Sequence, residues 1–220
     1  MSPLPLVLLA ATPAPAPAPG PAPIQRPQTV APLPGGLDAV LLVNDNNPEL
    51  ISEPGILLST FPGQGRSQPE AHLNLPLNGR FDLFSHHVFA GKPDQLNSTL
   101  WVAVVAQPRG IQPVTLQLLA GSTALSQATD RIQPQAPFLP LPTLMEQGST
   151  PVWAGPGSRV ATELLRRERS PVIPASWSLP PGQLSPLLLL PIPVRGLDPL
   201  LNGLNLQLRL QSDGPLDLAT

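Results

Sequence analysis

The chain has 220 residues, with 12 Lys or Arg against 14 Asp or Glu, so its formal net charge is −2. This near balance gives no electrostatic footprint for nucleic acid, and the absence of cysteine excludes a disulfide framework, a thiolate metal site and a cysteine nucleophile. The 34 prolines exclude long helices from most of the chain, because a proline inside a helix costs about 3 kcal/mol.

The N-terminal residues predict an export signal. Leu4 to Ala11 is a short apolar run that passes into small residues, as in a secretory signal, although no Lys or Arg precedes it and the first basic residue is Arg26. A disordered leader is the alternative interpretation. The run is too short for a membrane span, which needs about 20 apolar residues. We therefore expect an exported protein without a transmembrane span.

A spacer follows this leader. Residues 13–23 repeat Pro-Ala almost strictly, and such tracts form extended polyproline II segments that act as semi-rigid spacers. A ligand for a proline-binding partner is the alternative. The break at Pro34-Gly35-Gly36 then predicts two parts: a disordered leader and Pro/Ala-rich linker over 1–36, and a β-rich domain over 37–220.

The run Asn44–Glu49 is rich in side-chain oxygens. It lacks the glycine and the distal glutamate that an EF-hand calcium loop places at fixed spacing. An Asx turn that leads into Pro48 is the better interpretation.

A hairpin is predicted next, with its turn near Asn78-Gly79. Leu73 and Leu75 are expected to share its core face with Phe81 and Leu83, because a register slip of one residue would expose half of these side chains.

This hairpin contains all three histidines of the chain. In the allowed registers His72 and His86 lie on the face away from the core, together with Glu70. Two imidazoles and a carboxylate on one face can bind a metal, so these residues are the candidate metal ligands, although their spacing matches no known ligand signature. The alternative is ordinary polar pairing across the strands, with His87 buried and hydrogen-bonded.

Three other motifs are weak signals for a site. Ser85 precedes His86, but neighbours in a strand point to opposite sides and no Gly-x-Ser-x-Gly elbow is present, so we expect no catalytic triad there. Asn97-Ser98-Thr99 matches the glycosylation sequon, which is a frequent chance match. Gly155-Pro156-Gly157-Ser158 matches no phosphate-binding loop, so a turn and helix cap is the better interpretation.

One segment has helical spacing. Ser158–Arg169 contains neither proline nor glycine, and Ser158 is a plausible N-cap while Pro171 ends the pattern. Its apolar positions are Val160, Ala161, Leu164 and Leu165. Four arginines share the segment with two glutamates, which indicates a solvated face rather than an anion or RNA site.

The remaining pattern predicts strands. Alternation with period two is the signature of a half-buried strand, and it recurs at three places: Leu73, Leu75, Leu77; Val114, Leu116, Leu118; and Leu204, Leu206, Leu208, Leu210. Two near-continuous apolar runs, Thr99–Ala106 and Leu184–Val194, predict buried strands, the second an edge or bulged strand because three prolines interrupt it. The fold class is therefore mainly β: an antiparallel β-sandwich-like domain with one short helix at about 158–169.

Several phrases resemble one family of exported cyanobacterial proteins, catalogued as domain of unknown function 3370. The phrases are residues 46–50 (NNPEL), 55–62 (GILLSTFP), 79–88 (GRFDLFSHHV), 154–160 (AGPGSRV) and 190–197 (LPIPVRGL). The similarity runs from about Leu33 to the end. It implies a periplasmic or envelope-associated protein and carries over no catalytic residue. Family members are about twice this length, so the resemblance leaves open a missing C-terminal half whose absence would leave the final strand as an unpaired edge.

The sequence therefore favours a non-enzymatic structural or binding protein of the cell envelope. Its expected partner is an envelope protein or polysaccharide, with no nucleic acid and no cofactor. The alternative is an extracytoplasmic metal-dependent enzyme built on His72, His86 and Glu70.

Overall fold

The computed structural model describes residues 39–92, 94, 99–126 and 156–220. Backbone contacts divide the chain into two units, Met1–Gly35 and Gly36–Thr220. The leader and spacer predicted over 1–36, the first two residues of the sequon and Gly155 lie outside the described residues. No helix in the described part of the chain is long and apolar enough to cross a membrane.

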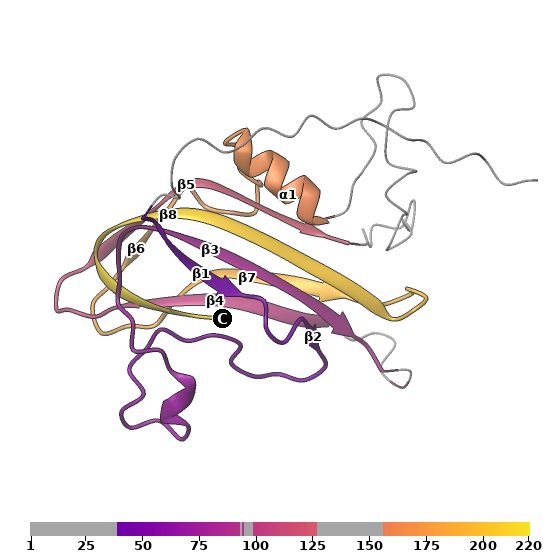
Figure 1. The fold of residues 1–220 in the computed structure, drawn as a ribbon, viewed down its shortest axis with the longest axis horizontal. Helices are drawn as coiled ribbons and strands as arrows, with labels where there is room; N and C mark the ends of the chain where they lie inside the picture. Colours follow the sequence, from indigo (N-terminus) through magenta and orange to yellow (C-terminus); the bar gives the residue numbers. More distant parts are fainter. Residues whose placement is uncertain (1–38, 93, 95–98, 127–155) are drawn as a thin grey trace, which may run out of the picture. The chain divides into compact units, whose positions relative to one another are not determined.

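The described part of the second unit is mainly β, as predicted, and Figure 1 shows its strands with an α-helix beside them. Eight strands form one sheet: β1 (Leu41–Asp45), β2 (Leu50–Ile51), β3 (Leu77–Ala90), β4 (Thr99–Pro108), β5 (Val114–Leu125), β6 (Ser176–Leu179), β7 (Ser185–Pro193) and β8 (Leu201–Ala219). The helices are the 3-10 turn η1 (Pro69–Ala71) and α1 (Pro156–Leu165). The sheet is mixed rather than wholly antiparallel, because β1 and β2 run parallel to β3.

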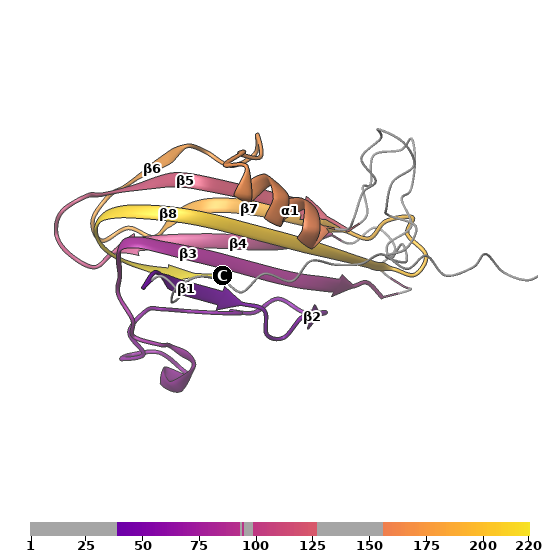
Figure 2. The ribbon, with the colours of Figure 1, turned by 45° about the horizontal axis from the view of Figure 1, so that its top comes forward.

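Strand β8 organises the sheet. Its first part lies between β3 and β5, and its last residues, Leu216–Ala219, pair with β4. Between these parts the strand curves round, as the yellow ribbon shows (Figure 1), so that β4 and β7 form a second layer. Figure 2 shows the same two layers from another side. The predicted alternation is confirmed, since Leu204, Leu206, Leu208 and Leu210 are all buried between the layers.

The end of β8 is not an unpaired edge. Leu216–Ala219 pairs with β4 on one side, and on the other side Thr60 donates its backbone N–H to the carbonyl of Leu218 at 2.9 Å. The backbone N–H of Leu57 likewise donates to the carbonyl of Thr220 at 2.9 Å. The expected unpaired edge is therefore wrong, because a segment from the first third of the chain occupies that position.

The predicted hairpin is also wrong. Asn78 and Gly79 lie inside β3, where the register with β8 shifts between Leu77 and Gly79 and Gly79 has a φ of +71°. An Asn-Gly pair signals a turn because glycine adopts positive φ freely, but a β-bulge uses the same property. Leu73 and Leu75 consequently lie outside the strand and are 60% and 40% exposed.

The two apolar runs form strands as predicted. Thr99–Ala106 falls within β4, and Leu184–Val194 contains β7, which pairs with β4 and ends the path of the sheet. The register between them shifts at Val104/Val105, so β7 is both an edge and a bulged strand. This position tolerates its prolines, since an edge strand leaves some backbone N–H groups unused by the ladder.

Helix α1 exists but is shifted from the predicted 158–169. It spans Pro156–Leu165, so Ser158 lies in its first turn and not at the N-cap. The helix ends before Pro171, because Arg167 adopts a left-handed φ of +58° and its N–H donates to the carbonyl of Leu164. Val160 is fully buried, and the helix packs on β5 and β8.

Candidate functional site

A cavity of about 420 Å³ lies on the outer face of the second layer. Val104 and Ala106 of β4 point into the core, so the alternate residues Ala103 and Val105 point outward and form part of the cavity floor. Further lining residues come from the segment before β3, from the loop before β7 and from the end of β8; among them are Ile56, Phe61, Leu184 and Ala219.

The wall of the cavity is a strand-like segment, residues 57–61, that runs beside the end of β8. On its other side it accepts backbone hydrogen bonds from Leu73 to Ser59 and from Leu75 to Thr60, each at 2.9 Å. Alternation along this segment places Ser59 and Phe61 at the cavity and directs Thr60 to the opposite side. Thr60 is fully buried, and its Oγ1 accepts the backbone N–H of Leu218 at 2.8 Å.

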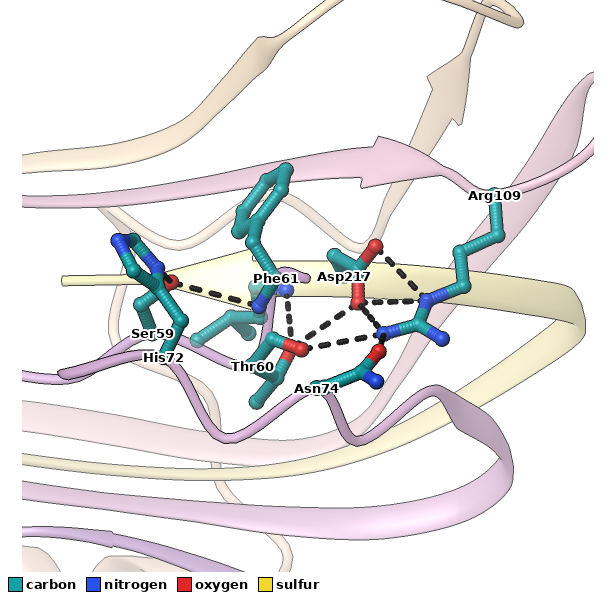
Figure 3. Close-up of polar contacts among 8 residues, drawn as sticks. Ser59, Thr60, Phe61, His72, Asn74, Arg109 and Asp217 are labelled. Carbon is teal, nitrogen blue, oxygen red and sulfur yellow. Dashed lines mark hydrogen bonds and ion pairs between the residues drawn. The ribbon is translucent and has the colours of Figure 1, made fainter. Parts of the chain in front are cut away.

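A serine and a histidine are hydrogen-bonded within this wall. Ser59 Oγ lies 2.7 Å from His72 Nδ1, and the backbone N–H of Phe61 donates to the same Oγ at 3.3 Å (Figure 3). Ser59 is only 2% exposed, while His72 is half-buried. When the ring proton is on Nε2, the serine hydroxyl donates to Nδ1, which is the arrangement of a nucleophile with its base.

An ion pair behind this wall fixes its position. Arg109 Nε donates to Asp217 Oδ2 at 2.9 Å, and its Nη2 lies 2.8 Å from Oδ1 (Figure 3). The same Nη2 donates to the carbonyl of Thr60 and to Asn74 Oδ1, each at 3.2 Å. The guanidinium of Arg109, which follows β4, therefore connects the end of β8, the 57–61 segment and the neighbouring residue Asn74. Because two parallel hydrogen bonds join the guanidinium to the carboxylate, this pairing fixes the relative orientation of the Arg109 and Asp217 side chains as well as their distance.

The mouth of the cavity carries positive charge. The guanidinium of Arg66 lies 6.0 Å from the ring centroid of Phe61, within the range of a cation–π contact. Gln107 and His72 add polar groups, and no Asp or Glu is among the described residues that line the cavity. The site therefore combines an apolar floor with hydrogen-bonding groups and a cation at its rim.

The structure does not bring the three predicted metal ligands together. Glu70 is exposed in η1, whereas His72 faces Ser59. His86 lies in β3, where its Nδ1 is 3.2 Å from Asn205 Nδ2 and its Nε2 is 3.4 Å from Glu49 Oε1. Within the described residues no group of three or more His, Cys, Asp or Glu is placed to hold a metal. The hairpin on which that prediction rested is absent, because its expected turn is a bulge.

The prediction that His87 is buried and hydrogen-bonded is confirmed. Its Nδ1 lies 2.9 Å from the carbonyl oxygen of Pro48, and its Nε2 lies 3.1 Å from Asp45 Oδ2. Both of these oxygens can accept, so the doubly protonated ring is the form that satisfies both contacts. Ser85 Oγ donates to the same carboxylate oxygen at 3.0 Å.

This buried ion pair changes the acidity of the histidine. Burial alone lowers the pKa of His87, but the hydrogen bond and the negative charge of Asp45 outweigh it and raise the pKa above 6.5. The Asp45 carboxylate, which belongs to the oxygen-rich run Asn44–Glu49, therefore joins β1 to β3.

Sequence reasoning missed the Ser59–His72 pair and the Arg109–Asp217 pair. Ser59 and His72 are 13 residues apart and Arg109 and Asp217 are 108 apart, and neither spacing belongs to a recognised motif. The one signal in the sequence for Arg109 was the small number of charged residues. Only 12% of the residues are charged, so a partner of opposite charge could have been sought for Arg109.

Comparison with protein families places the chain in one of them. Residues 28–220 match the family described as "Protein of unknown function (DUF3370)", so the chain belongs to this family and the predicted resemblance is confirmed. Neither a curated protein nor a solved structure matches it.

Proposed function

We propose that this member of the DUF3370 family is an exported, non-enzymatic binding protein of the periplasm or cell envelope. Its ligand is a small amphiphilic group displayed by an envelope protein or polysaccharide. The apolar leader and the Pro-Ala spacer support export and a tethered position. The cavity beside Ser59 and His72 is the proposed binding site, because its volume of about 420 Å³ falls in the range of ligand pockets.

The observation that carries this proposal is the apolar outer face around the cavity. Trp101 is on the same side of β4 as Ala103 and is 54% exposed, and Leu189, which is opposite Ala103 on β7, is 59% exposed. Leu184 at the cavity rim is 52% exposed. Neighbouring exposed apolar side chains at a polar rim are typical of interaction sites.

The test is ligand-observed NMR with three probe sets: methyl glycosides, short-chain fatty acids and N-acetylated dipeptides. We expect saturable binding by at least one set, and we expect Ala103→Trp to abolish it by filling the cavity. Ile111→Trp is the matched control, because Ile111 is 86% exposed and lies outside the cavity lining. Binding that survives in Ala103→Trp contradicts the proposed site.

A second candidate function rests on the 2.7 Å hydrogen bond between Ser59 and His72, which suits an acyl-transfer nucleophile. Such chemistry also needs a group that orients the base, and no carboxylate contacts His72 among the described residues. Hydrolysis of p-nitrophenyl butyrate by the purified protein distinguishes the two functions. Turnover that disappears in Ser59→Ala refutes the non-enzymatic proposal.

A further inference from the structure

A second cavity lies along one edge of β4, and we call it the β4 slot. Its volume is about 340 Å³. Four consecutive residues of β4 line it, and consecutive residues point to opposite faces of a sheet, so the slot is at the edge of the strand rather than over one face. The described lining residues are Thr99, Leu100, Trp101 and Val102 on the β4 side, and Ile51, Glu53, Pro54, Gly55 and Leu57 on the other side.

This edge of β4 is only half covered by strands. On the opposite edge, β4 pairs with β7 from Thr99 to Ala106. On the slot edge, pairing with β8 begins only at Val105, and the described residues supply no strand beside 99–104. Unpaired N–H and C=O groups along a strand edge are a template for a further strand.

The ladder with β7 shows which backbone groups point into the slot. Trp101 lies opposite Pro191, and Thr99 lies opposite Pro193. Because proline has no N–H, it fits the pairs of an antiparallel ladder whose backbone groups point away from the partner strand. The N–H and C=O groups of Thr99 and Trp101 therefore point into the slot, and by alternation those of Ala103 do so as well.

The last residues of β8 already occupy the position that the slot continues. Ala219 pairs with Val105 of β4, and Figure 1 marks this end of the chain beside β4. On the other side, the backbone N–H of Thr220 donates to the carbonyl of Leu58 at 3.0 Å, and the N–H of Leu57 donates to the carbonyl of Thr220 at 2.9 Å. A strand at this position therefore bonds alternately to β4 and to the segment across from it.

The register of β8 defines how a further strand would lie in the slot. It would run antiparallel to β4, with its first residue opposite Ala103 and its fifth opposite Thr99. Its second and fourth residues would face the core beside Val102 and Leu100, since paired residues share a face. Its first, third and fifth residues would lie on the outer face, where Trp101 is 54% exposed.

The charge of the slot favours a basic occupant. Glu53 is the charged residue among the described lining residues, and its side chain is 78% exposed. Lys92 lies 3.9 Å from Glu53 but is itself 52% exposed, and exposed pairs of this kind are weak. The exposed ring of Trp101 can also accept a cation on its face.

We propose that the β4 slot binds an extended segment of a partner protein, which adds a strand to β4. The segment has apolar residues at alternate positions and a basic residue between them. Backbone hydrogen bonds provide the affinity in this mode of recognition, and alternate side chains provide the specificity. Gly55 is the one described residue that lines both the slot and the cavity beside Ser59 and His72, and the proposal does not rest on the function proposed for that cavity.

The first test is calorimetric titration of the full chain with the acetylated and amidated peptide Thr-Val-Arg-Val-Thr. We expect saturable binding. The control peptide Val-Thr-Arg-Thr-Val has the same composition with the opposite alternation, and we expect it to bind at least about tenfold more weakly. The original peptide with an N-methylated arginine lacks the central N–H that would donate to β4, and we expect about fivefold weaker binding from the loss of this hydrogen bond.

Amide hydrogen exchange then locates the bound peptide. The N–H groups of Trp101 and Ala103 would gain a partner, so their exchange should slow at least about tenfold at saturating peptide. The N–H groups of Leu100 and Val102 point to β7 and should change much less. This alternating pattern distinguishes strand addition from binding over one face of β4.

A protein variant tests the same hydrogen bonds from the other side. Thr99→Pro removes one N–H that points into the slot, and proline is tolerated at the first residue of a strand. We expect it to bind the peptide about fivefold more weakly, whereas the matched control Thr99→Val keeps the N–H and should stay within about twofold of the wild type. Equal melting temperatures of the two variants would verify that both fold.

Three results would overturn the proposal. The first is the absence of saturable binding by Thr-Val-Arg-Val-Thr, or equal binding of the two alternations. The second is uniform exchange protection along β4 in place of the alternating pattern. The third is a wild-type dimer that the peptide does not dissociate, which would assign the slot to a second copy of the chain.

Discussion

Replacing His87 by Gln tests the buried ion pair of the core. The substitution removes the imidazole ring that lies between Asp45 Oδ2 and the carbonyl of Pro48. Both side chains of the pair are 0% exposed, so the variant would leave Asp45 buried without its ion-pair partner. Removing one partner of a buried pair costs about 3–5 kcal/mol, and we expect a loss of this size in the free energy of unfolding.

The pH dependence gives the second part of this prediction. The pKa of His87 in the folded protein is raised above 6.5, so the folded state holds its proton more tightly than the unfolded state does. The resulting stabilisation is fully present below pH 6.5 and is lost as the pH rises through the folded-state pKa. The wild type is therefore expected to lose stability over this window, and His87→Gln is expected to lack that decline.

Urea unfolding of both proteins at a series of pH values measures both parts. His86→Gln is the matched control, because His86 is the adjacent residue on the other face, its ion-pair partner Glu49 is 62% exposed, and glutamine keeps a polar group toward Asn205. Exposed pairs contribute about 0–1 kcal/mol, so this control should remain close to the wild type. Equal losses in the two variants, or identical pH profiles for wild type and His87→Gln, would refute the reasoning.

Three further outcomes are expected. Asp217→Asn should cost about 1–3 kcal/mol in urea unfolding, because it weakens the pairing of Arg109, which is 24% exposed; an unchanged midpoint would contradict the role given to this pair. Gly63→Ala should lower the melting temperature, since a Cβ there would lie 2.3 Å from the carbonyl oxygen of Pro69. Gly55→Ala is the control, because a Cβ at Gly55 meets nothing within 4 Å and should leave the melting temperature unchanged. Equal melting temperatures for the two variants would contradict this prediction. Purified protein should contain no stoichiometric metal, and it should melt at the same temperature with and without a chelator. A melting temperature that shifts with the chelator would support the alternative of a metal-dependent enzyme.

Local patterns predicted those parts of the fold that depend on neighbours in sequence. The alternation of Leu204 to Leu210 identified a half-buried strand because its period follows from strand geometry alone. The pairing partners did not follow, since β8 joins β3, β5 and β4, which lie far away along the chain. The Asp213-Gly214-Pro215 run lies within β8, where the strand passes from one layer to the other.

The candidate site was harder to predict than the fold. Asn78-Gly79 gave the same local signal for a bulge as for a hairpin turn, and that ambiguity placed His72 beside His86 instead of Ser59. His87 was predicted correctly because its burial follows from strand alternation and a buried imidazole requires partners. The identity of those partners required the parallel register of β1 on β3, which no local pattern encodes.

Amide-shift mapping on isotopically labelled protein tests the proposed binding function most directly. The probe is the amphiphile that binds in the ligand-observed experiment, titrated into the wild type and into Ala103→Trp. We predict saturable shifts confined to β4, the end of β8 and residues 55–72 in the wild type, and no such shifts in the variant. Shifts that map to another surface, or that persist with the cavity filled, would contradict the account.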